Sequence, residues 1–264
     1  MAVRVLLIFV CICLAVGGCK EPFEYESYPL AVTALVNHVS NQTQSFTYRK
    51  RRLSTYKTSG GTTASKSMVL HYEGDRLVFI TNDSTQYSYG RTVFYDQGNG
   101  YVIDSTFFYR LDSTSFEVDS TALRAVRTVN NNADGKPLLV TLQTWTLDTE
   151  TKEVLFAEEH AELTWQDDNV EHLTNSDYTT GERIVTRDIS IRYDGKYCVY
   201  MNLAEYLYTL TLKDLYWLSS SNPAAFGDVT GERPFSYNYN KIGYPSSFQS
   251  DTGTTYGVTY TQIR

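Results

Sequence analysis

Glu158-Glu159-His160 is the densest cluster of side chains that could bind a metal ion. Zinc needs three or four His, Cys, Asp or Glu ligands that converge on one point, and no His-Glu-x-x-His motif or cysteine pair accompanies this cluster. A strand with charged outward positions accounts for the same residues. The sequence therefore predicts no metal site and no cofactor.

Asn130–Gly135 matches the opening of a calcium-binding loop, with side-chain oxygens at alternate positions and glycine at the sixth. Thr141 stands where such a loop needs a glutamate, so a hairpin turn is the better interpretation. Carboxylate pairs such as Asp167-Asp168 also fall in predicted turns. No nucleophile elbow or phosphate-binding glycine loop occurs, and the sequence predicts no catalytic residue. A hydrolase with dispersed carboxylates stays open as an alternative, because the two acids of a glycosidase can lie far apart in sequence.

The N-terminus carries the most specific chemical signal. A short positive segment precedes the apolar stretch Val5–Val16, which is too short to span a bilayer comfortably, so residues 1–18 are predicted to be a signal peptide. Val16-Gly17-Gly18-Cys19 resembles a bacterial lipobox, in which cleavage after Gly18 exposes a cysteine that is then acylated. Cys19 is therefore the predicted lipidation site, and more than one acyl chain on it gives stable membrane anchoring.

Residues 19–30 are the predicted lipidated cysteine and its tether. The acidic run Lys20–Glu26 resembles the surface-export signal of Bacteroidetes lipoproteins. This resemblance predicts a lipid-anchored protein of the bacterial outer membrane that faces the cell exterior. An ordinary solvated tether on a periplasm-facing lipoprotein is the alternative.

The composition bounds the class of protein and its partners. A formal net charge of −7 repels a phosphate backbone, so nucleic acid is not an expected partner. Hydrophobic residues make up 42% of the 264 residues, which is enough to bury a core, and tyrosine occurs 22 times. No linker divides residues 31–264, which we interpret as a single β-rich domain in which Cys198 packs as a small hydrophobe.

An aromatic strand, a short polar turn and an apolar strand recur along the chain. The first copy is Leu70–Ile80, which turns at Glu73-Gly74-Asp75, and further copies are Leu163–Leu173 and Ile191–Tyr200. The last of these contains Asp194-Gly195, a strong hairpin signal. The alternation predicts a mainly β fold, either a large twisted antiparallel meander sheet or an open half-barrel.

One region breaks this alternation. Leu203, Tyr206, Leu207 and Leu210 follow helical spacing, although the same segment also reads as a strand. Leu215–Leu218 is densely apolar and stops before a proline. We expect one or two short helices here, packed on the sheet through Tyr206, Leu210, Trp217 and Leu218.

Two segments near the start of the domain are ambiguous. Leu30–Val39 could form a helix or a first strand. Arg49-Lys50-Arg51-Arg52 invites a nucleic-acid or lipid-headgroup interpretation. Strand alternation would divide these four cations between two faces, so we interpret the run as a charged sheet edge.

The hairpin units, together with Ser221-Asn222-Pro223, Gly243–Phe248 and Tyr256–Tyr260, resemble a family of Bacteroidetes lipoproteins that carry a β-rich domain of unknown function. Their hairpins are similar to the Tyr-Asp repeats of large secreted toxins and adhesins, and that dipeptide occurs here at Tyr95-Asp96 and Tyr193-Asp194. The resemblance implies a location and a fold. It implies no catalytic residues.

A broad, tyrosine-rich sheet offers rigid rings that can stack on sugars or peptides at low entropic cost. The candidate aromatic surface consists of Tyr72, Tyr87, Tyr89, Trp165 and Tyr193. The sequence thus predicts a non-enzymatic binding or accessory protein with a glycan or protein ligand, and leaves the oligomeric state open. The alternative is a periplasmic carrier that holds a lipid or another lipoprotein in an open half-barrel.

Overall fold

The computed structural model describes residues 30–61, 65–74, 76–84, 87–96, 98–110, 118–147, 153–200 and 211–262. Within these ranges, seventeen strands form one sheet. The strands are β1 (Leu30–Asn37), β2 (Gln42–Arg49), β3 (Arg52–Ser59), β4 (Lys66–Glu73), β5 (Arg76–Ser84), β6 (Tyr87–Asp96), β7 (Gly100–Arg110), β8 (Val118–Asn131), β9 (Pro137–Leu147), β10 (Glu153–Gln166), β11 (Asn169–Asp177), β12 (Ile184–Tyr197), β13 (Ser221–Asp228), β14 (Gly231–Pro234), β15 (Ser236–Tyr239), β16 (Pro245–Gln249) and β17 (Thr255–Gln262). A 3₁₀-helix, η2, spans Leu212–Leu218.

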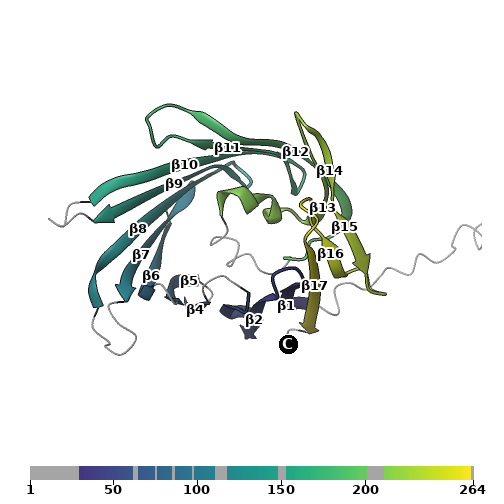
Figure 1. The fold of residues 1–264 in the computed structure, drawn as a ribbon, viewed down its shortest axis with the longest axis horizontal. Coiled ribbons are helices and arrows are strands. Elements are labelled where there is room, and N and C mark those ends of the chain that lie inside the picture. The colour runs from purple at the N-terminus through teal and green to yellow at the C-terminus, as the bar shows by residue number, and fades with distance from the viewer. Residues whose placement is uncertain are drawn as a thin grey trace, which may run out of the picture.

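The sheet curls into a nearly closed barrel. Its strands pair antiparallel among the described residues, and β1 pairs with both β2 and β17, which joins the start of the domain to its end. Between β14 and β15 the chain runs on, and the Phe235 amide donates to the Ala224 carbonyl at 2.8 Å. Figure 1 shows the strands as a ring with η2 inside it. The predicted mainly β meander is confirmed, and its closure goes further than a half-barrel.

Strand order defines the two ends of the barrel. Two-residue turns join β2 to β3, β4 to β5 and β10 to β11 at one end, which we name the tight-turn end. Leu30 of β1 pairs with Gln262 of β17 at this same end. The first described residue, Leu30, therefore lies at the tight-turn end.

The inward face carries the core because strand side chains alternate between the two faces of a sheet. In β12, Ile189 and Ile191 are buried, whereas Asp188 and Ser190 are exposed. Inside the barrel, the Trp217 indole of η2 packs against its neighbour Tyr216 and against aromatic side chains from other parts of the chain: Tyr200, Phe235 and Phe248.

The prediction that Trp217 and Leu218 pack on the sheet is confirmed, since Trp217 is buried and Leu218 packs against the core. Cys198 is also buried. Tyr206 and Leu210 lie outside the described residues. The prediction of a helix or a strand for their segment therefore stays a prediction.

The recurring aromatic residues connect neighbouring strands. A register shift falls immediately before Tyr48, Tyr72, Trp165 and Tyr193. Each bulge lies in the pairing with the following strand. On the other side, each of the four rings donates its polar hydrogen to a carbonyl on the preceding strand, at Val32, Leu53, Pro137 and Val170 respectively, over 2.6–2.8 Å. The aromatic repeat thus links each of these strands to the strand before it.

This role predicts a stability loss for Tyr193→Phe. The Tyr193 hydroxyl lies 2.8 Å from the Val170 carbonyl and 2.6 Å from the Ser219 hydroxyl. Its removal leaves partly buried polar groups unsatisfied, so the free energy of unfolding should fall by about 1–3 kcal/mol. Urea unfolding measures the change. Tyr95→Phe, at a site 51% exposed, should change stability by less than about 0.5 kcal/mol, and equal losses in both variants would contradict the linking role.

Three turn and strand assignments needed the structure. Leu30–Asn37 is a strand. Asp194-Gly195 is not a hairpin turn, because β12 continues to Tyr197 and takes up the extra residues as register shifts against β13. The basic run is not a sheet edge, because Lys50 and Arg51 form the turn between β2 and β3. The expected turns at Gly74, Asp167 and Gly135 are confirmed, and each of these residues has a positive φ angle.

A polar groove on the outer wall

The outer wall of the barrel is polar and charged over β10–β12. Arg183 pairs with Glu162 at 2.7 Å, and His172 pairs with Asp188 at 2.7 Å, all from outward positions of β10–β12 or the turn beside them. The Asp188 carboxylate also accepts a hydrogen bond from the Thr174 hydroxyl. Hydrogen bonds from Thr174 and His172 lower the pKa of Asp188. This face is therefore built for contact with water.

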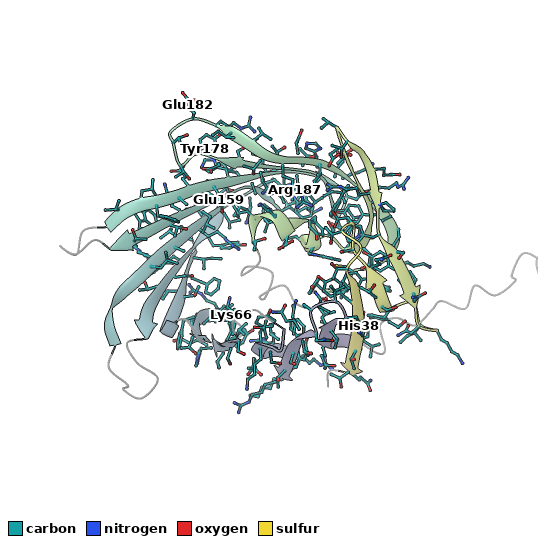
Figure 2. The ribbon with its side chains drawn as sticks, in the orientation of Figure 1. His38, Lys66, Glu159, Tyr178, Glu182 and Arg187 are labelled. Carbon is teal, nitrogen blue, oxygen red and sulfur yellow. The ribbon has the colours of Figure 1, made fainter. Side chains whose placement is uncertain are left out.

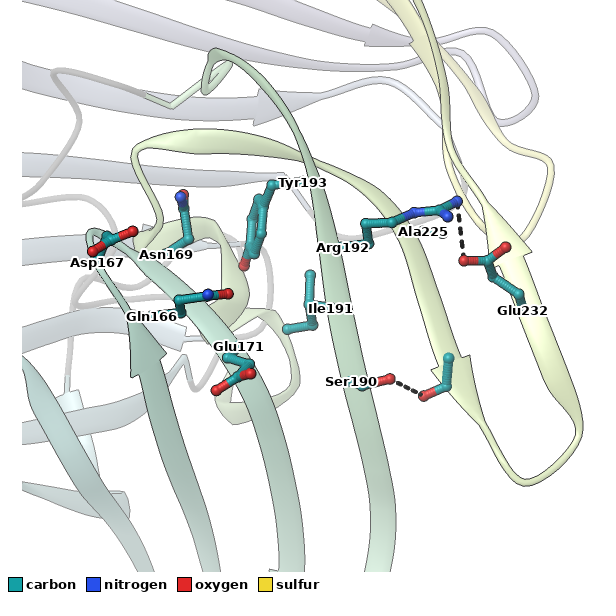
Figure 3. A pocket seen from close by; sticks show the side chains of 11 residues that line it. Gln166, Asp167, Asn169, Glu171, Ser190, Ile191, Arg192, Tyr193, Ala225 and Glu232 are labelled. Carbon is teal, nitrogen blue, oxygen red and sulfur yellow. Dashed lines mark hydrogen bonds and ion pairs between the residues drawn. The ribbon is translucent and has the colours of Figure 1, made fainter.

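A groove of about 450 Å³ lies in this wall (Figure 3). The β10–β11 turn supplies Gln166 and Asp167 on one side, and Glu232 of β14 closes the other side. Arg192 and Ser190 line it from β12. We name this depression the outer groove.

Small residues on β13 make the groove possible. Its lining includes Ala225 and Gly227 of β13, which leave little side-chain volume above the sheet. A β-carbon at Gly227 would lie 2.7 Å from the Ser190 hydroxyl oxygen, so a larger side chain there would collide with the lining. Alternation along β12 places the Tyr193 ring on the inward face with Ile191 and leaves the Arg192 side chain in the wall.

The charges of the groove are unbalanced toward negative. Arg192 pairs with Glu232 at 3.0 Å, and both side chains remain more than half exposed. Asp167 and Glu171 add two further carboxylates to the lining. Amides, carboxylates, a guanidinium and a hydroxyl can together donate and accept hydrogen bonds, whereas a polyanion would be repelled. The outer groove thus suits a neutral polar ligand.

Tyr193 forms the floor at the inner side of the groove. Its hydroxyl is held by Val170 and Ser219, and burial raises the pKa of Tyr193 above the ordinary value near 10. The phenol therefore stays neutral at physiological pH. It shapes the floor of the groove, is fixed there by these two hydrogen bonds, and adds no charge.

The predicted aromatic surface is not brought together as one exposed patch. Tyr72, Trp165 and Tyr193 are partly buried and pack against the core. Of these three, Tyr193 also lines the outer groove. Tyr87 and Tyr89 lie on β6, and their side chains fall outside the described part of the structure. The stacking role assigned to the first three is corrected, because their rings belong to the interior packing and the strand-to-strand links.

The lipidation site Cys19 and the cleavage site Gly18 lie outside the described residues, so both stay predictions.

The acidic cluster around His160 is split between the two faces of β10. His160 and Glu158 approach to 2.9 Å, and Gln143 donates to the same carboxylate at 3.1 Å. These hydrogen bonds lower the pKa of Glu158. Glu159 lies on the opposite face, inside the ring in Figure 2. Among the described residues no three His, Cys, Asp or Glu side chains gather to hold a metal ion.

Sequence reasoning missed the residues that build the outer groove. Gln166, Arg192 and Glu232 are far apart in the chain and become neighbours only through the strand order β10 to β14. Gln166 and Arg192 fall within the recurring hairpin units, but nothing in those units marks them as binding residues, and Glu232 belongs to no motif. Only the Tyr-Asp dipeptide beside Arg192 pointed to this part of the wall.

Comparison with known proteins adds little to this geometry. No family model matches the chain, and no curated protein does. Among solved structures, a porin-like protein from Bacteroides uniformis ATCC 8492 is 12% identical, with a TM-score of 0.35, over 89% of this chain and 98% of that one. A TM-score this low supports no conclusion about function. Within the described residues, no helix is long and apolar enough to cross a membrane.

Proposed function

We propose that the protein is a lipid-anchored lipoprotein of the bacterial outer membrane whose barrel stands in water and binds a neutral glycan in the outer groove, without catalysing a reaction. The observation that carries this proposal is the polar outer wall with its groove. The acyl anchor at Cys19 and the outward orientation come from the sequence alone.

The distribution of polarity supports a barrel that stands in water. A membrane-spanning barrel turns an apolar band about 25 Å tall toward lipid, and an Arg or Lys at its centre costs roughly 2–4 kcal/mol. On β10–β12 and the turn beside them, Arg183, Arg192 and Asp188 point outward, whereas Leu173 and Ile189 are buried on the inward face. A lipid anchor is then the means by which such a barrel would stay at the membrane.

The groove supports a sugar ligand better than a protein ligand. Hydroxyl groups of a sugar each donate and accept a hydrogen bond, and the exposed Arg192–Glu232 pair offers both functions side by side. The excess of carboxylates disfavours acidic glycans and phosphorylated ligands.

The carrier alternative is less well supported. It needs an open interior, but rings of Tyr200, Tyr216, Trp217 and Phe226 pack together in the part of the interior that the structure describes around η2.

Glu232→Gln tests the groove. The variant loses the charge-assisted acceptor of the outer groove, so affinity for a bound neutral glycan should fall about tenfold. Isothermal titration with a panel of neutral and acidic polysaccharides measures it. Glu162→Gln is the matched control, because it removes the carboxylate of the Arg183 pair on the same wall outside the groove.

A panel with no response, or equal losses in the two variants, would overturn the glycan proposal. The anchor is tested separately by metabolic palmitate labelling of wild type and Cys19→Ser. Protease shaving of intact cells tests whether the barrel faces the exterior.

A further inference from the structure

The turn between β2 and β3 holds two cations in an unfavourable backbone conformation. Lys50 and Arg51 have φ angles of 50° and 65°. The flanking Arg49 and Arg52 lie opposite each other in the register of β2 and β3. Two-residue hairpin turns of this kind strongly prefer Asn-Gly, because side chains with a β-carbon are strained at positive φ. The chain therefore carries two long cationic side chains at a conformational cost, which suggests a use for their charge.

These cations border a hollow in the barrel wall. The hollow has a volume of about 290 Å³, and Thr33, Thr47 and Gln262 line it together with Lys50 and Arg51. None of its described lining residues is acidic. Two cations, hydroxyls and an amide are donors that suit a phosphate or a similar oxyanion.

The basic turn, Arg49–Arg52, lies at the end where the described chain begins. Strand β2 runs antiparallel to β1, so the end of β2 lies beside the start of β1 at Leu30. Arg49, Lys50 and Arg51 are exposed. Arg52 is oriented by the Gly74 carbonyl, 2.6 Å from its guanidinium, and lies over the Tyr72 ring. From Cys19 to Leu30 the chain can reach at most about 40 Å, which keeps this end near any bilayer that holds the acyl chains.

We propose that the basic turn and its hollow dock the tight-turn end of the barrel onto anionic lipid headgroups of the membrane that holds the anchor. The docking rests on the proposed lipid anchor for its biological setting. A lipid chain combined with a basic patch is a known physical solution for stable membrane attachment. The contact also orients the barrel, because the outer groove then faces sideways into water.

Vesicle co-sedimentation of the full mature chain with Cys19→Ser tests the docking without the acyl anchor. Vesicles contain phosphatidylcholine alone or with 30% phosphatidylglycerol. We expect half-binding at roughly millimolar anionic vesicle lipid in low salt, loss of binding at high salt, and little binding to neutral vesicles.

Lys50→Asn/Arg51→Gly is the decisive variant, because Asn-Gly relieves the turn while removing both charges. Binding to anionic vesicles should weaken about tenfold or more, while the melting temperature stays equal or rises. Lys57→Gln/Lys213→Gln removes two other exposed cations and should bind within about twofold of the parent.

Unchanged binding by the turn variant, or tighter binding to duplex DNA than to vesicles, would overturn the docking proposal. Palmitate labelling reads the anchor independently. If Cys19 carries no palmitate but vesicle binding is salt-sensitive and depends on the basic turn, the anchor proposal is wrong and the docking proposal stands.

Discussion

The barrel should unfold abruptly as the pH rises from about 10 to about 11.5. Burial raises the pKa of five interior tyrosines above their ordinary value near 10: Tyr193, Tyr200, Tyr216, Tyr237 and Tyr260. Because their folded pKa lies above the unfolded one, their contribution to stability is fully present below pH 10 and is lost as the pH rises above it.

The magnitude makes this the largest effect we expect. Once the unfolded tyrosines ionise, each one costs about 1.4 kcal/mol of stability per pH unit, and five together cost roughly 7 kcal/mol per unit. Total stabilities of globular domains are about 5–15 kcal/mol. Near-UV circular dichroism and tyrosinate absorbance, recorded on the same samples, should therefore change together in one steep transition.

Tyr260→Phe is the informative variant for this prediction. The Tyr260 hydroxyl is buried without a hydrogen-bond partner in the structure, so its removal deletes one ionisable group and loses no hydrogen bond. The alkaline midpoint should move upward and the pH dependence should become about one fifth shallower. A barrel that keeps its near-UV signal at pH 12, or gradual tyrosine ionisation without unfolding, would contradict the prediction.

The strands could be predicted because burial on one face dictates alternation. Ile189, Ser190 and Ile191 show the pattern, with buried residues on both sides of an exposed one. Turn chemistry set most hairpin ends correctly, as Gly74 and Gly135 demonstrate. It failed at Asp194-Gly195, because a bulge uses the same left-handed glycine as a turn, and only pairing with β13 decides between them.

The closure of the barrel and the outer groove could not be predicted from sequence. Closure depends on the pairing of Leu30 with Gln262, at opposite ends of the domain, and no local pattern encodes so distant a contact. Arg192 and Glu232 likewise meet only because β12, β13 and β14 are adjacent. The sequence predicts strands and turns, whereas the contacts between distant residues that form the groove depend on strand order.

The sequence reveals the aromatic residues as a repeat, but the prediction that they form an exposed stacking surface is wrong for Tyr72, Trp165 and Tyr193, which pack against the core. Alternation placed Tyr72 on the face of Leu70, which is correct, since both contribute to the interior. What sequence could not show is that the Tyr72 hydroxyl donates to the Leu53 carbonyl on the preceding strand, so that the ring packs against the wall and is not free for stacking. The sequence predicts a ligand-binding ring at Tyr72, whereas in the structure its hydroxyl donates a hydrogen bond to a main-chain carbonyl.

Trp217→Ala should cost about 3–5 kcal/mol of folding free energy. The indole is only 6% exposed, and its ring centroid lies 4.9 Å from that of Tyr200 and 5.9 Å from that of Phe248. Truncation removes this aromatic packing and leaves a cavity beside η2 that rigid rings on the surrounding strands cannot fill. Urea unfolding followed by tyrosine fluorescence and far-UV circular dichroism measures the loss.

Two variants separate the packing of Trp217 from a general loss of apolar surface. Trp217→Phe keeps one ring in the cluster and should cost about 1–3 kcal/mol. Phe156→Ala removes an aromatic ring that is 64% exposed and should change stability by less than about 0.5 kcal/mol. If Trp217→Ala were as stable as Phe156→Ala, η2 would not hold the interior of the barrel together, and the carrier alternative with an open interior would regain its physical basis.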